Sequence, residues 1–546
     1  MHLQFSRHLL VMILLIANGP ARADSDLDRV NQQRRQAGLG LLLPDETLNL
    51  AAQRHADYLD RHREPGRTPQ GMTAHAQRPG DDGFSGETPA ARALAAGYPH
   101  REVLENVSMG YPDGDSAMTG LMSAIYHRLT FLDLEADQLG VAAGERSHVY
   151  LLGRSDIAGL CQTSPAEASY RTPVDCLGTA MTRDHYDAMC ADLPADALFR
   201  PSHPIACPNG LRLDAGYMAA LCERPPREAA FGGHGRYFVP CENGTRVDAT
   251  WFKALCNKPP EAAVYRPSGH YYEICEGPRQ VYAEWFEAQC AALPDSARYT
   301  DSGRYRRPCA TGADIRIEYL EQLDTARRKA LPEVVLWPPE GATDVVPAFF
   351  IEEPDPLPDF EVSGFPLSIQ FNPARAQEVE LTSFRLFRTD GDNPGAVEPV
   401  RLLDSGNDPN HLLSDHEFAL FPLNRLAWGA RYGAQVEARV DGVPRHFDWS
   451  FTTLGLGVPL LTADRAWQRF TVRNGIDYLL YLPPLADSPY TVLGTRTEHL
   501  RGNRVTLEVV DPNTLRVRVD ARYCDVIGIT FDSGRQAELI PQGCPQ

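Results

Sequence analysis

Lysine is nearly absent from this sequence of 546 residues. Only Lys253, Lys258 and Lys329 occur, so arginine carries nearly all of the positive charge, and 72 acidic residues outnumber the 53 basic ones. A chain with a formal charge of −19 and no basic stripe repels a phosphate backbone. We therefore expect no nucleic acid among its partners.

Long hydrophobic runs are also missing. No segment approaches the roughly 18 apolar residues that span a bilayer, so we expect no transmembrane segment in the mature chain. Residues 1–23 combine Arg7 and His8 with an apolar run from Leu9 to Ala17 and the closing triplet Ala21-Arg22-Ala23. This pattern predicts a secretory signal peptide cleaved after residue 23, with an uncleaved anchor as the alternative. The mature protein is then secreted or periplasmic.

Several catalytic and metal signatures are absent. The sequence contains no G-x-S-x-G, no Walker A, no H-E-x-x-H and no C-x-x-C. Their absence argues against an α/β-hydrolase, a P-loop NTPase, a zincin metalloprotease and a cysteine-ligated zinc site.

Cysteine does not occur before residue 161 and then occurs twelve times. Cys176, Cys207, Cys241, Cys275 and Cys309 are spaced 31, 34, 34 and 34 residues apart, and an aromatic residue follows each of them by ten positions. This period predicts small stacked modules in residues 161–330, each a ββα-like unit of a short hairpin followed by a short helix.

An even number of cysteines in an exported chain predicts disulfides. The second cysteine of each module recurs in the first four modules, but the fifth has Asp324 at that position. Pairing within each module would therefore leave two cysteines over. Pairing nearest neighbours across modules (161–176, 190–207, 222–241, 256–275, 290–309) uses all ten and is favoured, although spacing alone does not determine connectivity. The cysteines expected in disulfides, including a C-terminal pair, are Cys161, Cys176, Cys190, Cys207, Cys222, Cys241, Cys256, Cys275, Cys290, Cys309, Cys524 and Cys544.

The modules' aromatic residues have two interpretations, above all Trp251 and Trp285. An exposed row of rings could stack on the sugars of a cell-surface component. More often such rings form the core of their own module, because a unit of about 34 residues has little else to bury.

The pattern changes after a Pro-rich hinge at residues 331–359. Tyr432 to Val440 alternate apolar and polar residues, and a turn near Asp441-Gly442 leads into Phe447, Trp449 and Phe451. This predicts a hairpin with one buried face. Together with residues 367–371 and 379–387 it resembles a bacterial Ig-like β-sandwich, which we place at 331–456, followed by a small β domain at 457–546.

The N-terminal part reads as helices around a small sheet. Asp45 is placed to cap a helix whose buried stripe includes Leu48, His55 and Leu59. Further helices are expected at 88–97 and from residue 117 to about 134, and a strand at 149–153.

Several short motifs occur in a characteristic order in this part. They are Leu27-Asp-Arg-Val-Asn31, Leu48-Asn-Leu-Ala-Ala52, Ala74-His75, Glu105-Asn106-Val107 and Tyr126-His127-Arg128. This succession resembles the CAP superfamily, also called SCP domains, which comprises the cysteine-rich secretory, antigen 5 and pathogenesis-related 1 proteins. The resemblance covers residues 24–155, about a quarter of the chain, and implies an α-β-α sandwich domain at 24–160 within an α+β multidomain protein.

The resemblance also implies a ligand groove. The family's cleft residues correspond to His75, Glu87, Glu105 and His127. Two imidazoles suit zinc or a similar divalent metal ion, so His75 and His127 are the expected metal ligands. The structural alternatives are hydrogen-bonded groove histidines, and for Glu87 an acidic group at the N-terminus of the helix 88–97. His55 is expected to be a satisfied core residue.

Two functions follow from this organisation. The favoured one is a secreted bacterial binding protein whose groove holds a divalent metal or a small hydrophobic ligand. The alternative is a metal-dependent hydrolase or peptidase that uses a His/Glu-activated water. We favour binding because fold resemblance alone does not confer an activity, and no catalytic nucleophile is evident.

Overall fold

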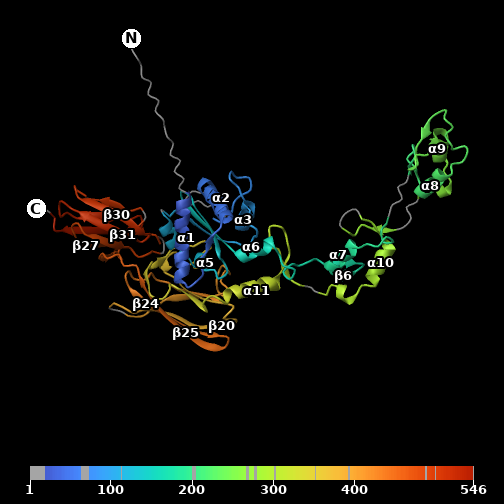
Figure 1. The fold of residues 1–546 in the computed structure, drawn as a ribbon. Coiled ribbons are helices and arrows are strands. Elements are labelled where there is room, and N and C mark those ends of the chain that lie inside the picture. The colour runs from blue at the N-terminus through green and yellow to red at the C-terminus, as the bar shows by residue number, and fades with distance from the viewer. Residues whose placement is uncertain are drawn as a thin grey trace, which may run out of the picture. The chain divides into compact units, whose positions relative to one another are not determined.

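The chain folds into two compact units, Met1–Ser169 with Tyr305–Gln546, and Tyr170–Arg304. The computed structural model (Figure 1) describes residues 19–62, 73–111, 113–199, 205–265, 270–275, 279–300, 303–350, 352–391, 394–485, 489–492, 494–498 and 500–544. Residues 1–18 of the predicted signal peptide lie outside the described residues.

The N-terminal part is a four-stranded sheet with helices around it. Its elements are α1 (Gly19–Gln36), β1 (Leu43–Pro44), α2 (Glu46–His62), α3 (Pro89–Ala96), β2 (Leu104–Met109), α4 (Gly114–Ser123), α5 (Ile125–Phe131), β3 (Gln138–Ala143), β4 (Ser147–Gly153) and α6 (Ser155–Gln162). The strand order is β1-β3-β4-β2, with β1 parallel to β3 and the other pairs antiparallel.

Both faces of this sheet are buried. Along β4, Val149 and Leu151 belong to the hydrophobic cluster that contains the buried side of α2, whereas Tyr150 and Leu152 belong to the cluster that contains Phe131 of α5. The alternation follows from the two-residue period of a strand. Asp45 caps α2 as predicted, because its Oδ1 accepts the backbone N–H groups of residues 47 and 48 at 2.9 and 3.0 Å.

The single helix predicted from residue 117 to about 134 is wrong. It is divided at Ala124, whose backbone is extended (φ −83°, ψ 123°). The N–H groups of Tyr126 and His127 in α5 donate to Oε1 of Glu352 at 2.8 and 3.0 Å. A carboxylate 225 residues away along the chain thus caps the second helix, and its charge is favourable at a helix N-terminus.

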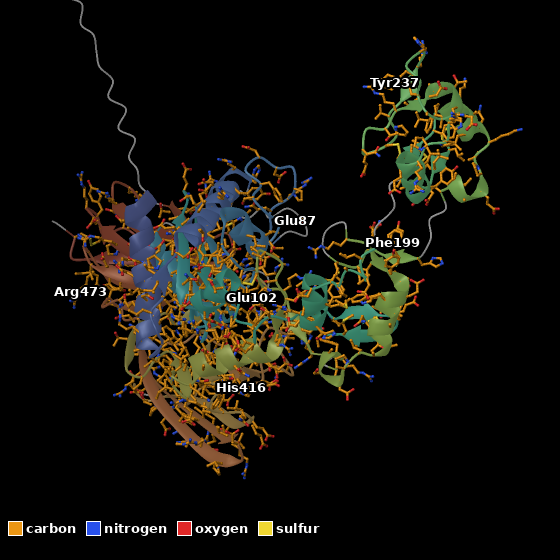
Figure 2. The ribbon with its side chains drawn as sticks, turned by 45° about the vertical axis from the view of Figure 1, so that its right-hand side comes forward. Glu87, Glu102, Phe199, Tyr237, His416 and Arg473 are labelled. Atoms are coloured by element: carbon orange, nitrogen blue, oxygen red, sulfur yellow. A yellow bond between two sulfur atoms is a disulfide. The ribbon has the colours of Figure 1, made fainter. Side chains whose placement is uncertain are left out.

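The repeats have the predicted hairpin-and-helix form. Their elements are β5 (Val174–Cys176), β6 (Thr179–Met181), α7 (Arg183–Ala191), β7 (Ile205–Ala206), β8 (Arg212–Leu213), α8 (Ala215–Glu223), β9 (Tyr237–Phe238), β10 (Val247–Asp248), α9 (Ala249–Asn257), the 3₁₀ turn Glu261–Ala263, β11 (Tyr271–Tyr272), β12 (Val281–Tyr282), α10 (Ala283–Ala291), the 3₁₀ turn Asp295–Ala297, β13 (Tyr305–Arg306), β14 (Ile315–Arg316) and α11 (Ile317–Arg328). Figure 2 labels Tyr237, the first residue of β9, whose side chain is exposed.

All twelve cysteines form disulfides, but nearest-neighbour pairing is wrong for most of the array. The bonds are Cys161–Cys309, Cys176–Cys290, Cys190–Cys275, Cys207–Cys256, Cys222–Cys241 and Cys524–Cys544. The five bonds of the array are nested, each inside the one before it along the chain. Of the neighbouring pairs predicted in the array, the structure contains Cys222–Cys241, at the point where the chain reverses.

The nesting joins modules reciprocally. The hairpin cysteine of the first module bonds the helix cysteine of the fourth, and the helix cysteine of the first bonds the hairpin cysteine of the fourth; the second and third modules are joined in the same way. The fifth module is joined once, from Cys309 to Cys161 of α6. Where its second cysteine is missing, Asp324 forms an ion pair with Arg154 at 2.6 Å. The fifth module thus lacks a second cysteine, and no other module is joined to it by two disulfides.

The tryptophans of the array are half-buried. Trp251 packs against the core shared by the second and third modules, and Trp285 against the core shared by the first and fourth. This packing favours the core interpretation of these two rings over an exposed sugar-binding row.

After α11 the chain forms two sheets. The strands are β15 (Val334–Trp337), β16 (Ala342–Val345), β17 (Ala348–Phe349), β18 (Ser363–Gly364), β19 (Leu367–Phe371), β20 (Val379–Arg388), β21 (Gly395–Ala396), β22 (Val400–Leu403), β23 (Glu417–Pro422), β24 (Arg431–Val440) and β25 (Val443–Thr453). One sheet has the order β15-β19-β23-β22 and the other β16-β25-β24-β20-β21, while β17 and β18 form a separate pair.

The predicted hinge is not a free linker. Residues 331–359 supply β15, β16 and β17, and Trp337 lies in the same hydrophobic cluster as Met118 and Met122 of α4 and the inner residues of β24. We call the part from α1 to α6 the first domain and the part from β15 to β25 the two-sheet domain. The two therefore share one continuous core.

The C-terminal part has two four-stranded sheets. The strands are β26 (Leu460–Thr462), β27 (Trp467–Arg473), β28 (Asp477–Tyr481), β29 (Arg496–Glu498), β30 (Arg504–Asp511), β31 (Thr514–Asp520), β32 (Ile527–Thr530) and β33 (Gln536–Gln542). Their orders are β26-β28-β31-β30 and β27-β33-β32-β29. Across the described residues, no helix has the length and hydropathy needed to cross a membrane.

Candidate functional site

His75 is held by a buried carboxylate. Its Nδ1 lies 3.0 Å from Oε1 of Glu105 on β2. The guanidinium of Arg92 on α3 donates through Nη2 to both oxygens of Glu105, at 2.8 and 2.7 Å, and through Nη1 to the carbonyl oxygen of His75 at 2.9 Å. Arg92 and Glu105 are almost completely buried, whereas the side chain of His75 is 31% exposed. Arg92 therefore fixes both the acid and the backbone of the histidine.

Glu105 remains ionised in this arrangement. Burial by itself would raise the pKa of its carboxyl group, but the hydrogen bond with His75 and the charge of Arg92 outweigh burial and hold the pKa below its ordinary value. A charged Glu105 then favours a proton on Nδ1 of His75, since a carboxylate only accepts.

His127 is held in the same way by an acid from the two-sheet domain. Its Nδ1 lies 2.7 Å from Oε1 of Glu352, the atom that caps α5. The side chain of Glu352 is fully buried, and that of His127 is 13% exposed. The carbonyl oxygen of His127 also accepts from Nδ2 of Asn106 on β2, at 2.8 Å.

The two histidines are neighbours. Their ring centroids are 6.4 Å apart and the planes differ by 27°. With each Nδ1 turned to a carboxylate, Nε2 is the nitrogen that remains on each ring for a ligand. The site therefore consists of two adjacent imidazoles, each oriented by its own buried acid, and we refer to His75, Glu105, His127 and Glu352 as the histidine pair site.

Glu87, a predicted groove residue, does not join this site. It is exposed, and its backbone carbonyl accepts from the N–H of Gln77 at 3.2 Å. Glu87 directly precedes Thr88, whose hydroxyl caps α3. Figure 2 labels it at the edge of the N-terminal elements. In the part of the chain that the structure describes, no three His, Cys, Asp or Glu side chains are grouped to hold a metal ion.

His55 is a core residue, as expected. It is fully buried on α2, with Nε2 2.9 Å from the carbonyl oxygen of Ala74 and Nδ1 3.0 Å from Nε2 of Gln77. Facing an acceptor on one side and a donor on the other, the ring is neutral with its proton on Nε2. Burial lowers the pKa of His55 to about 4, although Glu105 lies nearby.

The sequence analysis did not predict Glu352 of this site, nor Arg92, which holds Glu105. The sequence did contain an indication of the role of Arg92, because it is the one charged residue in the helix Pro-Ala-Ala-Arg-Ala-Leu-Ala-Ala. The sequence around Glu352 gave little indication of its role, since this residue follows a short apolar stretch in a Pro-rich segment that is typical of a hinge. Its partner lies 225 residues away.

We expect acid to destabilise the first domain between pH 6.5 and 4, in part through His100. This fully buried ring lies 3.0 Å from the carbonyl oxygen of Arg154 through Nε2 and accepts the N–H of Glu102 through Nδ1 at 3.2 Å, and burial lowers its pKa to about 4. In the unfolded chain His100 takes up a proton near pH 6.5, so the folded state loses about 2–3 kcal/mol as pH falls to 4.

The measurement is urea unfolding at pH 4–7, monitored through the hydrogen-exchange protection of β2–β4. His100→Gln should flatten the pH dependence in this window relative to the wild type, whereas the exposed His411→Asn should leave it unchanged. An equally steep pH dependence in His100→Gln would contradict the conclusion that His100 is neutral in the folded state.

The first domain thus combines a sheet that is buried on both faces with two histidines, each bonded to a buried acid. In the comparisons, residues 27–152 match the CAP family, described as the cysteine-rich secretory protein family. The predicted CAP domain is confirmed for that segment, which is under a quarter of the chain.

Solved structures similar to this chain cover parts of it. An extracellular protein containing an SCP domain from Bacillus anthracis str. Ames is 19% identical, covering 24% of this chain and 40% of that one, with a TM-score of 0.21. The copper resistance protein PcoC from Escherichia coli is 18% identical, covering 22% of this chain and 94% of that one, with a TM-score of 0.14. This chain thus spans less than half of the Bacillus protein. No curated protein matches the chain.

Proposed function

We propose that this chain is an exported binding protein whose CAP domain holds a divalent metal ion through His75 and His127. Carboxylates at both Nδ1 atoms carry the proposal, because metal-binding histidines are commonly oriented by such a carboxylate behind the ring. Neutral imidazole nitrogens suit zinc and similar ions. The six disulfides point to an oxidising compartment, which agrees with export.

Two protein ligands leave most of the coordination shell to other molecules. Glu105 and Glu352 already bind the histidines, so their part is to orient the rings and keep the proton on Nδ1. A bound ion would supply a Lewis-acidic centre for oxygen, nitrogen or sulfur atoms of a second molecule. The protein would then bind its ligand through the metal, with the repeats and the two-sheet domain, which we propose to be Ig-like, as spacer or adhesive parts.

The test is metal titration of the purified full-length mature chain after chelator treatment, with Zn²⁺ or Co²⁺ as probe and calorimetry or cobalt absorption as readout. One ion should bind per chain. His75→Ala and His127→Ala should abolish binding, and Glu352→Gln should weaken it by about 10–100-fold, the range usual for such orienting partners. His411→Asn is the matched control. Stoichiometric binding that survives both alanine variants would overturn the proposal.

A hydrolase is the second candidate, because an imidazole backed by a carboxylate is also the arrangement of a general base. The discriminating assay is turnover of peptide and ester libraries with and without chelator. Chelator-sensitive turnover that is lost in His127→Ala would identify a metal-dependent hydrolase. Metal uptake without turnover would identify a binding protein.

A further inference from the structure

The hairpin of the third module exposes three consecutive large apolar residues. Tyr237 and Phe238 of β9 are each 44% exposed, and Val239 is 51% exposed (Figure 2). A second ring supports each aromatic side chain, because the ring centroids of Phe231 and Tyr237 are 4.9 Å apart, as are those of Phe238 and Phe252. Single exposed apolar residues are ordinary, but a contiguous group of them indicates a surface that meets a partner.

Two arginines accompany these apolar residues. The guanidinium carbon of Arg246 lies 4.7 Å from the ring centroid of Tyr237, and Arg236 directly precedes that tyrosine. Both arginines are exposed, and among the described residues neither forms an ion pair with a carboxylate. The hairpin therefore presents apolar side chains together with positive charge that no acid of the described chain neutralises.

The corresponding positions are polar and paired in the next two modules. The three hairpins have the same register, with the Cα partners Phe238↔Val247, Tyr272↔Val281 and Arg306↔Ile315. One residue further along, the side chains that face each other are Val239 and Arg246, Glu273 and Gln280, and Arg307 and Asp314. The fourth module's pair is hydrogen-bonded at 3.0 Å, and the fifth module's pair is an ion pair at 2.8 Å. The fold of the hairpin thus does not require an apolar residue beside an unpaired arginine.

The second and third modules are less acidic than the rest of the chain. Residues 205–265 contain seven basic and six acidic residues, whereas the whole chain has a formal charge of −19. Two of the six acids, Asp214 and Asp248, are engaged as helix caps. Because salt screens charges over about 8 Å, the local charge decides what this hairpin attracts.

We propose that the hairpin of the third module contacts a lipid bilayer with anionic headgroups. Phe238 and Val239 enter the boundary between headgroups and acyl chains, and the ring of Tyr237 lies at the level of the headgroups. Arg236 and Arg246 extend to the lipid phosphates, since positive charge complements an anionic membrane surface. An acidic polysaccharide would use the arginines but would leave the exposed Phe238 and Val239 in water. The apolar residues therefore favour the bilayer.

The test is flotation of the full-length mature chain with vesicles of phosphatidylcholine, with and without phosphatidylglycerol. The protein should float with the mixed vesicles at low salt and much less with phosphatidylcholine alone, and high salt should reduce binding. Tyr237→Ser should weaken binding by about 5-fold. Tyr271→Ser is the matched control, because Tyr271 has the same hairpin position in the fourth module and the same 44% exposure; it should bind like the wild type.

A second variant, Val239→Glu/Arg246→Gln, introduces the pair that the fourth module carries at these positions, so it is compatible with the hairpin fold. It removes an apolar contact and a positive charge and adds a negative one, and should weaken vesicle binding by at least about 10-fold. Unchanged binding in this variant, or no binding of the wild type to the mixed vesicles, would overturn the proposal. So would tighter binding to the soluble acidic polysaccharide alginate that the vesicles do not compete, because the partner would then be an anionic glycan.

Discussion

An Arg92→Met variant is expected to lose about 3–5 kcal/mol of unfolding free energy in the first domain, the usual cost of removing one partner of a buried ion pair. Arg92 is fully buried and holds both oxygens of Glu105 as well as the carbonyl oxygen of His75. Without it, a carboxylate remains buried beside His75 and the neutral ring of His55, and the backbone of His75 loses a hydrogen bond. Urea unfolding, monitored through hydrogen exchange in β2–β4, measures this loss of unfolding free energy.

Two controls separate the ion pair from the change of residue. The exposed Arg78→Met, in the same loop as His75, should change stability by no more than about 0.5 kcal/mol. Adding Glu105→Gln to Arg92→Met should recover part of the loss, because the unpaired charge is removed. A single Arg92→Met variant as stable as Arg78→Met would contradict the central role of this pair.

The ion pair also predicts acid sensitivity in a second window. The pKa of Glu105 is held below its ordinary value in the folded state, so its contribution is present above the unfolded pKa near 4.5 and is lost as pH falls through the lower folded pKa. This window begins near pH 4.5, at the lower end of the one assigned to His100, and extends below it. Stability of Glu105→Gln should therefore fall less steeply than that of the wild type at the acid end.

Removing either outer disulfide of a module pair is expected to cost about 3.5 kcal/mol. Cys176–Cys290 and Cys207–Cys256 have sequence separations of 114 and 49, which would predict unequal effects if each bond acted alone. Each, however, encloses a second bond, Cys190–Cys275 or Cys222–Cys241. The loop that each outer bond newly closes is therefore about 30 residues in both cases, which gives similar stabilisation in the chain-entropy model.

The measurement compares Cys176→Ser/Cys290→Ser with Cys207→Ser/Cys256→Ser in the full chain. Fluorotryptophan NMR during denaturant unfolding reports the two module pairs separately, because Trp285 packs in one and Trp251 in the other. Each double variant should destabilise its own pair and leave the other nearly unchanged. Losses that scale with the full sequence separations would contradict the nested account.

Local patterns predicted the elements whose causes are local. The side chains of Asp45 and Thr88 cap the helices that follow them, and Gly97 ends α3 with a left-handed backbone at φ +100°. In β24 the alternation of Tyr432 to Val440 is reproduced as alternating burial, because one face of that strand lies on the core. Such signals lie within a few residues of the element that they determine.

The histidine pair site was predictable only in part. His75, Glu105 and His127 were identified by motif order, and the structure brings them together. Glu87 was the second acid predicted for the groove, but the acid bonded to His127 is Glu352. The predicted single helix is divided at Ala124 for a related reason. The carboxylate of Glu352, from another domain, caps α5 there. No local pattern encodes a contact across 225 residues.

By itself, the sequence determined the charge, the repeat period and the even cysteine count, because these are properties of composition and spacing. It also determined the amphipathic helices and strands, since their periods follow from backbone geometry. Only the tertiary structure decided which modules pair and which acid faces His127. Each of these depends on segments that meet only after the chain has reversed and packed, and on the shared core that joins the first two domains.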